Sequence, residues 1–342
     1  MKKYRIGILG ATGAVGREIL KVLSERNFPL EKLKLFASEK SKGKRIVFNK
    51  KSYEVGTVDK DSFCGLDFVF GAVKNDIAKL YADDIVKSGA TFIDNSSEYR
   101  LFGNVPLVIP EINPDDAFLN GGKGIISNPN CSTIIILTAI NSINKISKIL
   151  KIIVSTYQAA SGMGQSGLDR LGYEARSYNS DNVAPPNNGK NVFPEQLIFN
   201  VIPSIGRPLA GGYTSEEAKL TYEARKILHN DDLKVSATCV RVPVFRSHSM
   251  SVNIVTENHI DVNEAKLAIK NAGGCVLSDD ISSGIFPTPL KSSDKDAVYV
   301  GRIREDPTDK NGIALWCSGD QLRKGAALNA VQIAELLIKN RK

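Results

Sequence analysis

The chain has 342 residues, of which 42% are hydrophobic and 24% are charged, and its formal net charge is +8. This composition allows a large core and excludes a disordered chain, and the length predicts two domains. The scattered lysines indicate either a lysine-rich surface or attraction of phosphorylated small molecules, and no basic run interleaved with aromatic residues points to nucleic acid.

The N-terminal part alternates short apolar strands with helices. Strands are expected at residues 4–9, 33–37, 68–72 and 91–94, and helices at 14–26 and 76–88. This alternation predicts an α/β fold with a Rossmann-type, doubly wound parallel sheet, whose ligands lie beyond the carboxyl ends of the strands. We expect this dinucleotide-binding domain to span residues 1–129 and to be completed by a C-terminal helix within 321–342.

The character of the sequence changes after the first domain. Strands are expected at residues 152–158, 234–242 and 250–257, and a loop rich in Asn, Pro, Ser and Gly at 176–193. The strands at 234–242 and 250–257 are predicted to be antiparallel neighbours joined by a short loop. No segment resembles a signal peptide or approaches the roughly 20 apolar residues of a membrane span, so we expect a cytoplasmic protein without a membrane partner.

A glycine-rich loop, Gly10-Ala-Thr-Gly13-Ala-Val-Gly16, follows the first strand and opens the first helix. Glycines permit close approach of the backbone to a pyrophosphate, and the helix N-terminus favours the anion, so the loop predicts dinucleotide binding. The second strand ends at Ser38 and is followed by Glu39-Lys40-Ser41-Lys42. Hydroxyl groups and cations there favour the 2′-phosphate of NADP, although Glu39 keeps NAD as the alternative.

The five cysteines and three histidines have no metal-ligand spacing, so no metal site is expected. The odd number and wide spacing of the cysteines argue against a disulfide framework and favour a reducing compartment. Cys131 alone has polar flanks and precedes a helical pattern. At a helix N-terminus the dipole favours the thiolate, so we interpret Cys131 as a nucleophile and the other four as small buried residues.

Taken together, these residues resemble the aspartate-β-semialdehyde dehydrogenase family nearly end to end. Beside the glycine loop, the segments that carry the resemblance are Asp94–Arg100 (DNSSEYR), Ser127–Thr133 (SNPNCST), Val154–Gly162 (VSTYQAASG), Phe199–Pro203 (FNVIP) and Ser236–Ser249 (SATCVRVPVFRSHS). The resemblance implies that residues 130–320 form an α+β catalytic and dimerisation domain with a large mixed sheet. It also implies a homodimer or homotetramer.

The resemblance implies a role for each matching position. Cys131 matches the acyl-thioester nucleophile, His248 the general acid/base, and Gln158 a residue that orients the substrate. Four positions match substrate contacts of the family. Arg241 matches the residue that clamps the substrate carboxylate, Glu216 the acidic group that faces the substrate amine, and Arg100 and Lys219 the pair that binds phosphate. Cofactor contacts match Gly10, Thr12, Gly13, Ala14, Val15, Ser38, Lys40, Ser41, Ser161, Gly162 and Gln321.

Some of these positions can be weighed without the resemblance. Glu216 and Lys219 are three apart in a helical stretch and share a face, which suits either a site or a surface ion pair. The planar guanidinium of Arg241 suits bidentate binding of a carboxylate. His248 on its own could be a structural histidine. The chain departs from the family pattern in the turn at Phe70–Asn75, and it has Ser247 where glycine is usual and Met250 where glutamate is common.

The implied reaction is the reduction of L-aspartyl-4-phosphate by NADPH to L-aspartate-4-semialdehyde and phosphate through a thioester on Cys131. The reaction belongs to the biosynthesis of lysine or diaminopimelate, threonine and methionine. Two alternatives remain: an enzyme like N-acetylglutamyl-phosphate reductase, and a non-enzymatic NADP-binding sensor.

Overall fold

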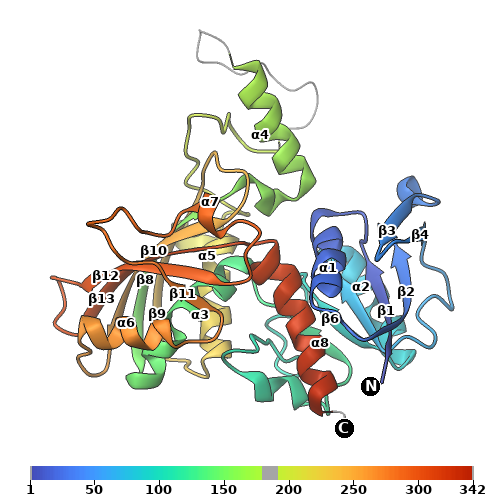
Figure 1. Ribbon diagram of the computed structural model, residues 1–342, viewed down its shortest axis with the longest axis horizontal. Coiled ribbons are helices and arrows are strands. Elements are labelled where there is room, and N and C mark those ends of the chain that lie inside the picture. Colours follow the sequence, from blue (N-terminus) through green and yellow to red (C-terminus); the bar gives the residue numbers. More distant parts are fainter. Residues whose placement is uncertain (1, 179–191, 341–342) are drawn as a thin grey trace. The chain divides into compact units, whose positions relative to one another are not determined.

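A computed structural model describes residues 2–178 and 192–340 (Figure 1). These residues form two compact units. The first holds the described residues up to Asn130, together with Lys226–Leu228 and those from Gly325 onward, and the second holds Cys131–Arg225 and His229–Lys324. Most of the loop expected at 176–193 lies outside the described residues.

The first unit contains a seven-stranded sheet with the order β3-β4-β2-β1-β5-β6-β7 in the part of the chain that is described. All neighbouring strands are parallel except the antiparallel pair β3 and β4. The strands are β1 (Tyr4–Leu9), β2 (Leu30–Phe36), β3 (Arg45–Phe48), β4 (Lys51–Gly56), β5 (Phe68–Gly71), β6 (Thr91–Asp94) and β7 (Ile125–Ser127). The helices are α1 (Ala14–Glu25), η1 (Glu39–Ser41), α2 (Asn75–Lys87), η2 (Pro114–Phe118) and α8 (Leu328–Asn340).

Alternating side chains of the parallel strands build a core on each face of this sheet. Ile6 and Ile8 of β1 pack in a cluster with residues of α1 and α8, whereas Leu9 packs in a second cluster with residues of α2. Because a strand turns successive side chains to opposite faces, two separate cores require helices on both faces. This arrangement confirms the predicted doubly wound sheet.

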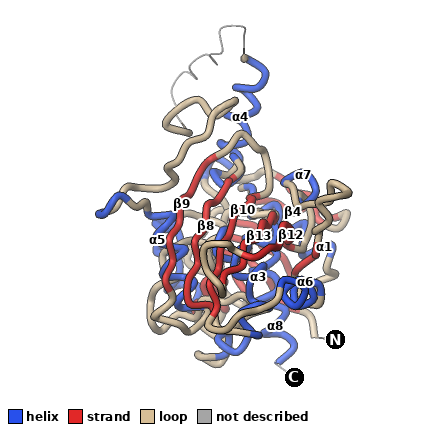
Figure 2. The backbone as a smooth tube through the Cα atoms, turned by 90° about the vertical axis from the view of Figure 1, so that its left-hand side faces the viewer, coloured by secondary structure: helices blue, strands red, loops and turns tan. Residues whose placement is uncertain are grey.

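The second unit contains a mixed six-stranded sheet with the order β11-β12-β13-β10-β8-β9 among the described residues. Its strands are β8 (Ile149–Gln158), β9 (Lys234–Arg241), β10 (His248–Thr256), β11 (Cys275–Leu277), β12 (Val298–Glu305) and β13 (Gly312–Gly319). Figure 2 shows β9, β8, β10, β13 and β12 side by side in this order. Its helices are α3 (Cys131–Ile146), η3 (Ala160–Met163), α4 (Gln165–Ser177), η4 (Ala210–Gly212), α5 (Ser215–Ile227), α6 (Val262–Lys270) and α7 (Pro289–Ser292), followed by a π-helical turn, η5 (Arg323–Ala327).

Among the described residues, helices cover one face of the six-stranded sheet, and the opposite face, referred to as the open face, keeps exposed side chains. Helices α3 and α6 pack on the covered face, where Met250, Val252 and Ile254 of β10 are buried. On the open face, Ile153 and Tyr157 of β8 keep 48% and 37% of their surface exposed. The mixed sheet agrees with the predicted fold class.

The predicted hairpin between residues 234–242 and 250–257 is wrong. Strand β9 pairs in parallel with β8, and β10 pairs antiparallel with the other edge of β8. Strand β8 therefore lies between them, and the connection at residues 242–247 crosses its end instead of forming a tight turn. The apolar alternation predicted the strands, but it carried no information on which strand lies between them.

Several elements were not expected from the sequence. The β3–β4 hairpin turns at Asn49 and Lys50, which both have positive φ angles of 47° and 65°. The two strands are too short to show a clear alternation and their turn contains no glycine, so the sequence gave little indication of a hairpin. The expected C-terminal helix begins with the π-helical turn η5 and continues as α8. No described helix is long and apolar enough to cross a bilayer.

Candidate active site

In the first unit, a pocket of about 410 Å³ lies where β1, β2 and β5 end. Its walls include the glycine loop, the end of β2 and the side chains of Ile77 and Tyr81 on α2. Four residues predicted to bind the cofactor line it, namely Gly10, Thr12, Gly13 and Ser38. The position matches the ligand crevice of an open parallel sheet.

The glycine loop has the geometry that a pyrophosphate requires. A Cβ at Gly10, where φ is +90°, would lie 2.3 Å from the carbonyl oxygen of Ala72, and one at Gly16 would lie 2.3 Å from that of Gly10. The N-cap residue of α1, Gly13, provides no side-chain cap, and the first-turn N–H groups, including those at Ala14 and Val15, lie at the positive end of the helix dipole. The loop therefore fits a dinucleotide pyrophosphate.

The segment after β2 has hydroxyl groups beside the pocket. Ser38 lines the pocket, and the Thr12 hydroxyl lies 3.5 Å from the hydroxyl of buried Ser41. Lys40 is exposed. Glu39 also lines the pocket, and its carboxylate pairs with Lys42 at 3.5 Å, so part of its charge is offset by a neighbour.

Arg100 also belongs to the first unit and is 7% exposed. Its Nε donates to the carbonyl oxygen of Asn128 at 3.0 Å, and its Nη2 donates to that of Asn95 at 2.8 Å. Lys226 Nζ donates to three carbonyl oxygens of the same loop, those of Arg100, Phe102 and Val105, at 2.7–2.8 Å. Two main-chain carbonyl groups thus help to hold the guanidinium.

In the second unit, three strand termini meet at one edge of the sheet. Gln158 ends β8 and is in register with Arg241, which ends the parallel strand β9. His248 begins the antiparallel strand β10, next to the end of β8. The side chains of Gln158, Arg241 and His248 are 2%, 4% and 0% exposed, so the sheet edge brings three predicted site residues together in a buried cluster.

Helix α5 adds a carboxylate and an amine to this cluster. Glu216 is 7% exposed, and its Oε2 pairs with Lys219 Nζ at 3.0 Å on the same helix face. Its other oxygen lies 3.5 Å from Gln158 Nε2. The carboxylate of the pair is therefore buried beside Gln158, another predicted site residue, whereas the lysine keeps 31% of its side chain exposed.

Arg241 and the turn after β8 are packed tightly against each other. Arg241 Nη1 donates to the carbonyl oxygen of Ala159 at 2.6 Å. A Cβ at Gly162 would lie 2.7 Å from the same Nη1, so a larger residue there would press on the guanidinium. Burial lowers the pKa of Arg241, and the charges of Glu216 and Cys131 act in the opposite direction. A buried, positively charged fork beside a carboxylate suits a substrate that carries both a carboxylate and an amine.

Cys131 is the first residue of α3 and is only partly buried. Its sulfur is close enough to Arg241 and Cys239 for its charge to affect both groups. In contrast, burial raises the pKa of Cys239 to about 12, and burial also raises the pKa of Cys317. A helix N-terminus and a nearby guanidinium favour the thiolate form of a cysteine. Cys64 is exposed and Cys275 is only partly buried, so the expectation that the other four cysteines are buried is wrong for these two.

Two buried carboxylates that support the cluster were missed in the sequence. Glu217 accepts hydrogen bonds from the N–H groups of Thr214 at 2.7 Å and Cys239 at 3.0 Å. Asp320, which is fully buried, accepts from Arg246 Nε at 2.6 Å and from the main chain at Leu322. Glu217 could have been found from the sequence, because Thr214-Ser-Glu-Glu217 has the spacing of a capping box. No sequence pattern indicated the role of Asp320.

Gln321 uses its side-chain amide inside the protein. Its Oε1 accepts from the N–H of Ser247 at 2.8 Å, and its Nε2 donates to the hydroxyl of Ser161. Ser247 has a φ of 73°, a left-handed conformation that favours glycine. The amide therefore ties the residue before His248 to the turn that carries Gly162.

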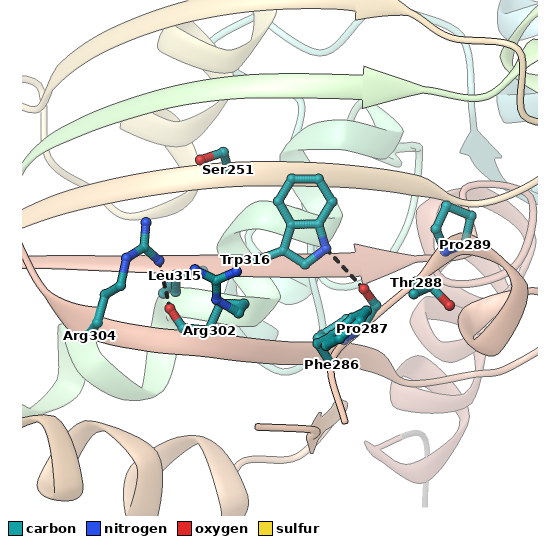
Figure 3. A pocket seen from close by; sticks show the side chains of 9 residues that line it. All are labelled: Ser251, Phe286, Pro287, Thr288, Pro289, Arg302, Arg304, Leu315 and Trp316. Carbon is teal, nitrogen blue, oxygen red and sulfur yellow. Dashed lines mark hydrogen bonds between the residues drawn. The ribbon is translucent and has the colours of Figure 1, made fainter. Parts of the chain in front are cut away.

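A further pocket of about 370 Å³ lies on the open face of the second sheet (Figure 3). Trp316 of β13 and Ser251 of β10 line it together with Phe286 and Pro287, and Trp316 Nε1 donates to the carbonyl oxygen of Pro287 at 3.1 Å. None of the predicted site residues lies there. Among the described residues, no cluster of His, Cys, Asp or Glu side chains could hold a metal ion.

The chain matches two family descriptions that together cover most of its length. Residues 5–119 match "Semialdehyde dehydrogenase, NAD binding domain", and residues 141–324 match "Semialdehyde dehydrogenase, dimerisation domain".

Curated relatives and solved structures match the chain over nearly all of its length. An aspartate-semialdehyde dehydrogenase from Aquifex aeolicus is 45% identical over 337 residues, covering 98% of both chains, and one from Bacillus subtilis is 41% identical over 339 residues, covering 98% of this chain and 97% of the relative. The crystal structure of aspartate semialdehyde dehydrogenase II complexed with ASA from Vibrio cholerae has a TM-score of 0.95 at 38% identity over 100% of both chains. A structure of aspartate semialdehyde dehydrogenase with NADP from Candida albicans has a TM-score of 0.76 at 25% identity, covering 98% of this chain and 99% of the other.

Proposed function

Because this chain belongs to the aspartate-semialdehyde dehydrogenase family, we propose that it reduces L-aspartyl-4-phosphate to L-aspartate-4-semialdehyde and phosphate with NADPH. The observation that supports this most directly is the buried cluster of the second unit. There, the partly exposed thiol of Cys131 begins α3, and Gln158, Arg241, His248 and the Glu216–Lys219 pair meet at one sheet edge. This set provides a nucleophile and charged partners for a small amino acid.

Different residues are proposed to bind different groups of the substrate. Arg241 binds the α-carboxylate through its planar fork, and Glu216 faces the α-ammonium group, for which its buried charge is suited. Lys219 and Arg100 bind the phosphate that leaves. Gln158 orients the acyl group, and His248 is the general acid/base that handles the proton as the thiohemiacetal collapses.

Cys131 carries the covalent chemistry. Its thiolate attacks the carbonyl carbon of the acyl phosphate, phosphate leaves, and a thioester remains on the sulfur. N–H groups at the start of α3 stabilise the oxyanion of this step. Bound NADPH supplies the hydride that reduces the thioester. When the carbonyl re-forms, the C–S bond breaks and the thiolate returns to its starting state.

The pocket of the first unit is proposed as the NADP site. Gly10, Thr12, Gly13, Ala14 and Val15 bind the pyrophosphate, and Ser38, Lys40 and Ser41 bind the 2′-phosphate. Ser161, Gly162 and Gln321 are proposed as further cofactor contacts, and the side-chain amide of Gln321 donates to the hydroxyl of Ser161. We propose a dinucleotide-binding domain of residues 1–129, completed by 321–342, and a catalytic and dimerisation domain of residues 130–320.

A homodimer is the assembly that we propose. The open face of the six-stranded sheet carries the exposed side chains of Ile153 and Tyr157 and the pocket around Trp316, an apolar surface that a partner would cover. The matched dimerisation domain includes all three residues. The cysteines form no disulfide in the described part of the chain, which supports a reducing, cytoplasmic location.

The decisive assay measures phosphate-dependent reduction of NADP⁺ with aspartate semialdehyde. Activity should disappear after treatment with a thiol-alkylating reagent and in Cys131→Ala, while NADPH binding should remain in that variant. Parallel assays with N-acetylglutamate semialdehyde test the neighbouring enzyme class, because an acylated amine carries no positive charge for Glu216. If no NADPH forms in a phosphate-dependent way, the proposed activity is refuted, and the alternative of a non-enzymatic NADP-binding protein is favoured.

A further inference from the structure

Ser247, the residue before His248, has a backbone conformation that a side chain disfavours. Its φ angle is 73°, in the left-handed region, where a Cβ crowds the following carbonyl oxygen. A residue with a Cβ therefore stays in this region only when other contacts hold it there, whereas glycine adopts it without such help. Because β10 begins at His248, the direction in which the imidazole leaves the main chain depends on this turn.

Two hydrogen bonds hold Ser247 in this conformation. Its N–H donates to Oε1 of Gln321 at 2.8 Å, and its hydroxyl lies 3.0 Å from the hydroxyl of Ser293. The side chain of Ser247 is fully buried, so bulk water does not compete for the hydroxyl. A glycine at this position could make the first of these bonds but not the second.

The hydroxyl of Ser247 is the donor of the pair. A hydroxyl has one hydrogen, and carbonyl oxygens can only accept. The Oγ of Ser293 donates to the carbonyl oxygen of Pro289 at 2.8 Å, which is shorter than its contact with Ser247. A lone pair of this Oγ then accepts from Ser247. Removal of the Oγ from Ser293 would therefore take away the acceptor of a buried hydroxyl, which is costly.

The position of Ser293 is fixed by bonds that do not involve Ser247. Ser293 follows α7, and its N–H donates to the carbonyl oxygen of Pro289 at 3.0 Å. The next residue, Asp294, donates its N–H to the buried carboxylate of Asp320 at 2.7 Å. The segment that carries the acceptor is thus tied to its surroundings independently of the residue at position 247.

We propose that Ser293 is a positioning residue for His248 and that it acts through Ser247. The bond between the two hydroxyls holds the left-handed turn that places the imidazole, a turn that glycine would adopt without a partner. The inference rests on the proposed function, in which His248 is the general acid/base. The sequence gave no sign of this role, because 46 residues separate Ser247 from Ser293.

The first test compares two substitutions of Ser247. Ser247→Ala keeps the Cβ and loses the hydroxyl, whereas Ser247→Gly loses both. We expect kcat for phosphate-dependent NADP⁺ reduction to fall about 5-fold or more in Ser247→Ala and to fall less in Ser247→Gly, because the left-handed region disfavours a Cβ by a factor of about 5–30. Active sites are counted by alkylation of Cys131. A kcat of Ser247→Ala equal to or above that of Ser247→Gly would overturn the proposal.

The second test removes the acceptor in two backgrounds. Ser293→Ala should lower kcat about 5-fold or more when Ser247 is present, and less than about 2-fold when it is combined with Ser247→Gly, because glycine needs no acceptor. The KM for NADP⁺ should not change in either case, since the glycine loop is untouched. Ser293→Thr keeps the hydroxyl and should retain most of the activity. Equal losses from Ser293→Ala in the two backgrounds would contradict the proposal.

The matched control on the same segment is Ser292→Ala. Ser292 is also buried and its hydroxyl also meets that of another serine, but this partner is Ser318 of β13, at 2.9 Å. Its substitution should therefore change kcat by the same factor with and without Ser247→Gly. If its effect also disappears in the presence of Ser247→Gly, the segment acts by general loosening, and the specific role of Ser293 is refuted.

A third measurement does not depend on turnover. The chain has three histidines, and NMR of the ¹⁵N-histidine-labelled protein follows the ring of His248, whose signals are those missing from His248→Gln. We expect these signals to shift or broaden in Ser247→Ala and in Ser293→Ala, but not when Ser293→Ala is added to Ser247→Gly. Unchanged ring signals in either alanine variant would sink the proposal, so one variant decides if the other does not fold. A protein that shows these shifts but never forms NADPH from aspartate semialdehyde and phosphate would refute only the proposed function.

Discussion

Replacing Glu217 with alanine should destabilise the second unit and weaken substrate binding together. The side chain is 6% exposed, and its two oxygens accept from the N–H groups of Thr214 and Cys239. Alanine leaves both buried donors without an acceptor, at about 1–3 kcal/mol each, so partial relaxation gives an expected loss of about 2–4 kcal/mol. Glutamine keeps one acceptor, and Glu217→Gln should lose about half as much.

Trp316 makes the measurement specific to the second unit. It is the only tryptophan of the chain and lies on β13, in the same sheet as β9. Urea unfolding followed by its fluorescence should show the ranking wild type, Glu217→Gln, Glu217→Ala. The matched control is Glu264→Ala, an exposed glutamate in the first turn of α6, which should lose no more than about 0.5 kcal/mol.

The same substitution should raise the KM for aspartate semialdehyde. Glu217 fixes the first turn of α5, which carries Glu216 and Lys219, to strand β9, which ends with Arg241. Loss of this link lets the two sides of the substrate site move apart, while the glycine loop is untouched and NADPH affinity should not change. If Glu217→Ala is no less stable than Glu264→Ala, or if its KM equals that of wild type, the reasoning is refuted.

Three further predictions concern the substrate cluster. Alkylation mapped by mass spectrometry should modify Cys131 well before Cys239 and Cys317, whose pKa values are raised by burial; faster labelling of Cys239 would contradict the assignment. Arg241→Lys should raise the KM for the semialdehyde about 10-fold or more, because an ammonium cannot form the bidentate fork, and an unchanged KM would remove the clamp role. Gly162→Ala should also impair use of the semialdehyde, because its Cβ would press on Arg241 Nη1; steady-state kinetics equal to wild type would show that the turn can move aside.

The first half of the fold was predictable because its signals are local. Strands such as β1 and β5 are short apolar runs, and the glycine loop has its meaning only between a strand and a helix, which is where it stands. The same is true of Cys131, since polar residues followed by a long apolar helix place it at a helix start. The β3–β4 hairpin, with its turn at Asn49 and Lys50, lacked such a signal.

The supporting residues of the site were harder to predict because their partners are distant in the sequence. Asp320 accepts from Arg246, 74 residues away, and Gln321 accepts from the amide of Ser247. Nothing near these positions in the sequence indicates the bonds. Ser247 shows the same difficulty, because its left-handed conformation explains why glycine is usual there, yet serine itself gives no sign of it.

Comparing the predicted β9–β10 hairpin with the observed strand order shows how the topology positions Arg241 and His248. A β9–β10 hairpin would also bring Arg241 and His248 to one edge, but as direct neighbours. In the structure β8 lies between them, parallel to β9 and antiparallel to β10, so β8 and β9 end where β10 begins. Ala159, one residue beyond β8, therefore lies between the two side chains; its N–H donates to His248 and its carbonyl oxygen accepts from Arg241. A direct hairpin has no third strand ending at that place, so no residue of such a strand could bond to both side chains. The order of the three strands therefore determines how His248 and Arg241 are held against the same residue.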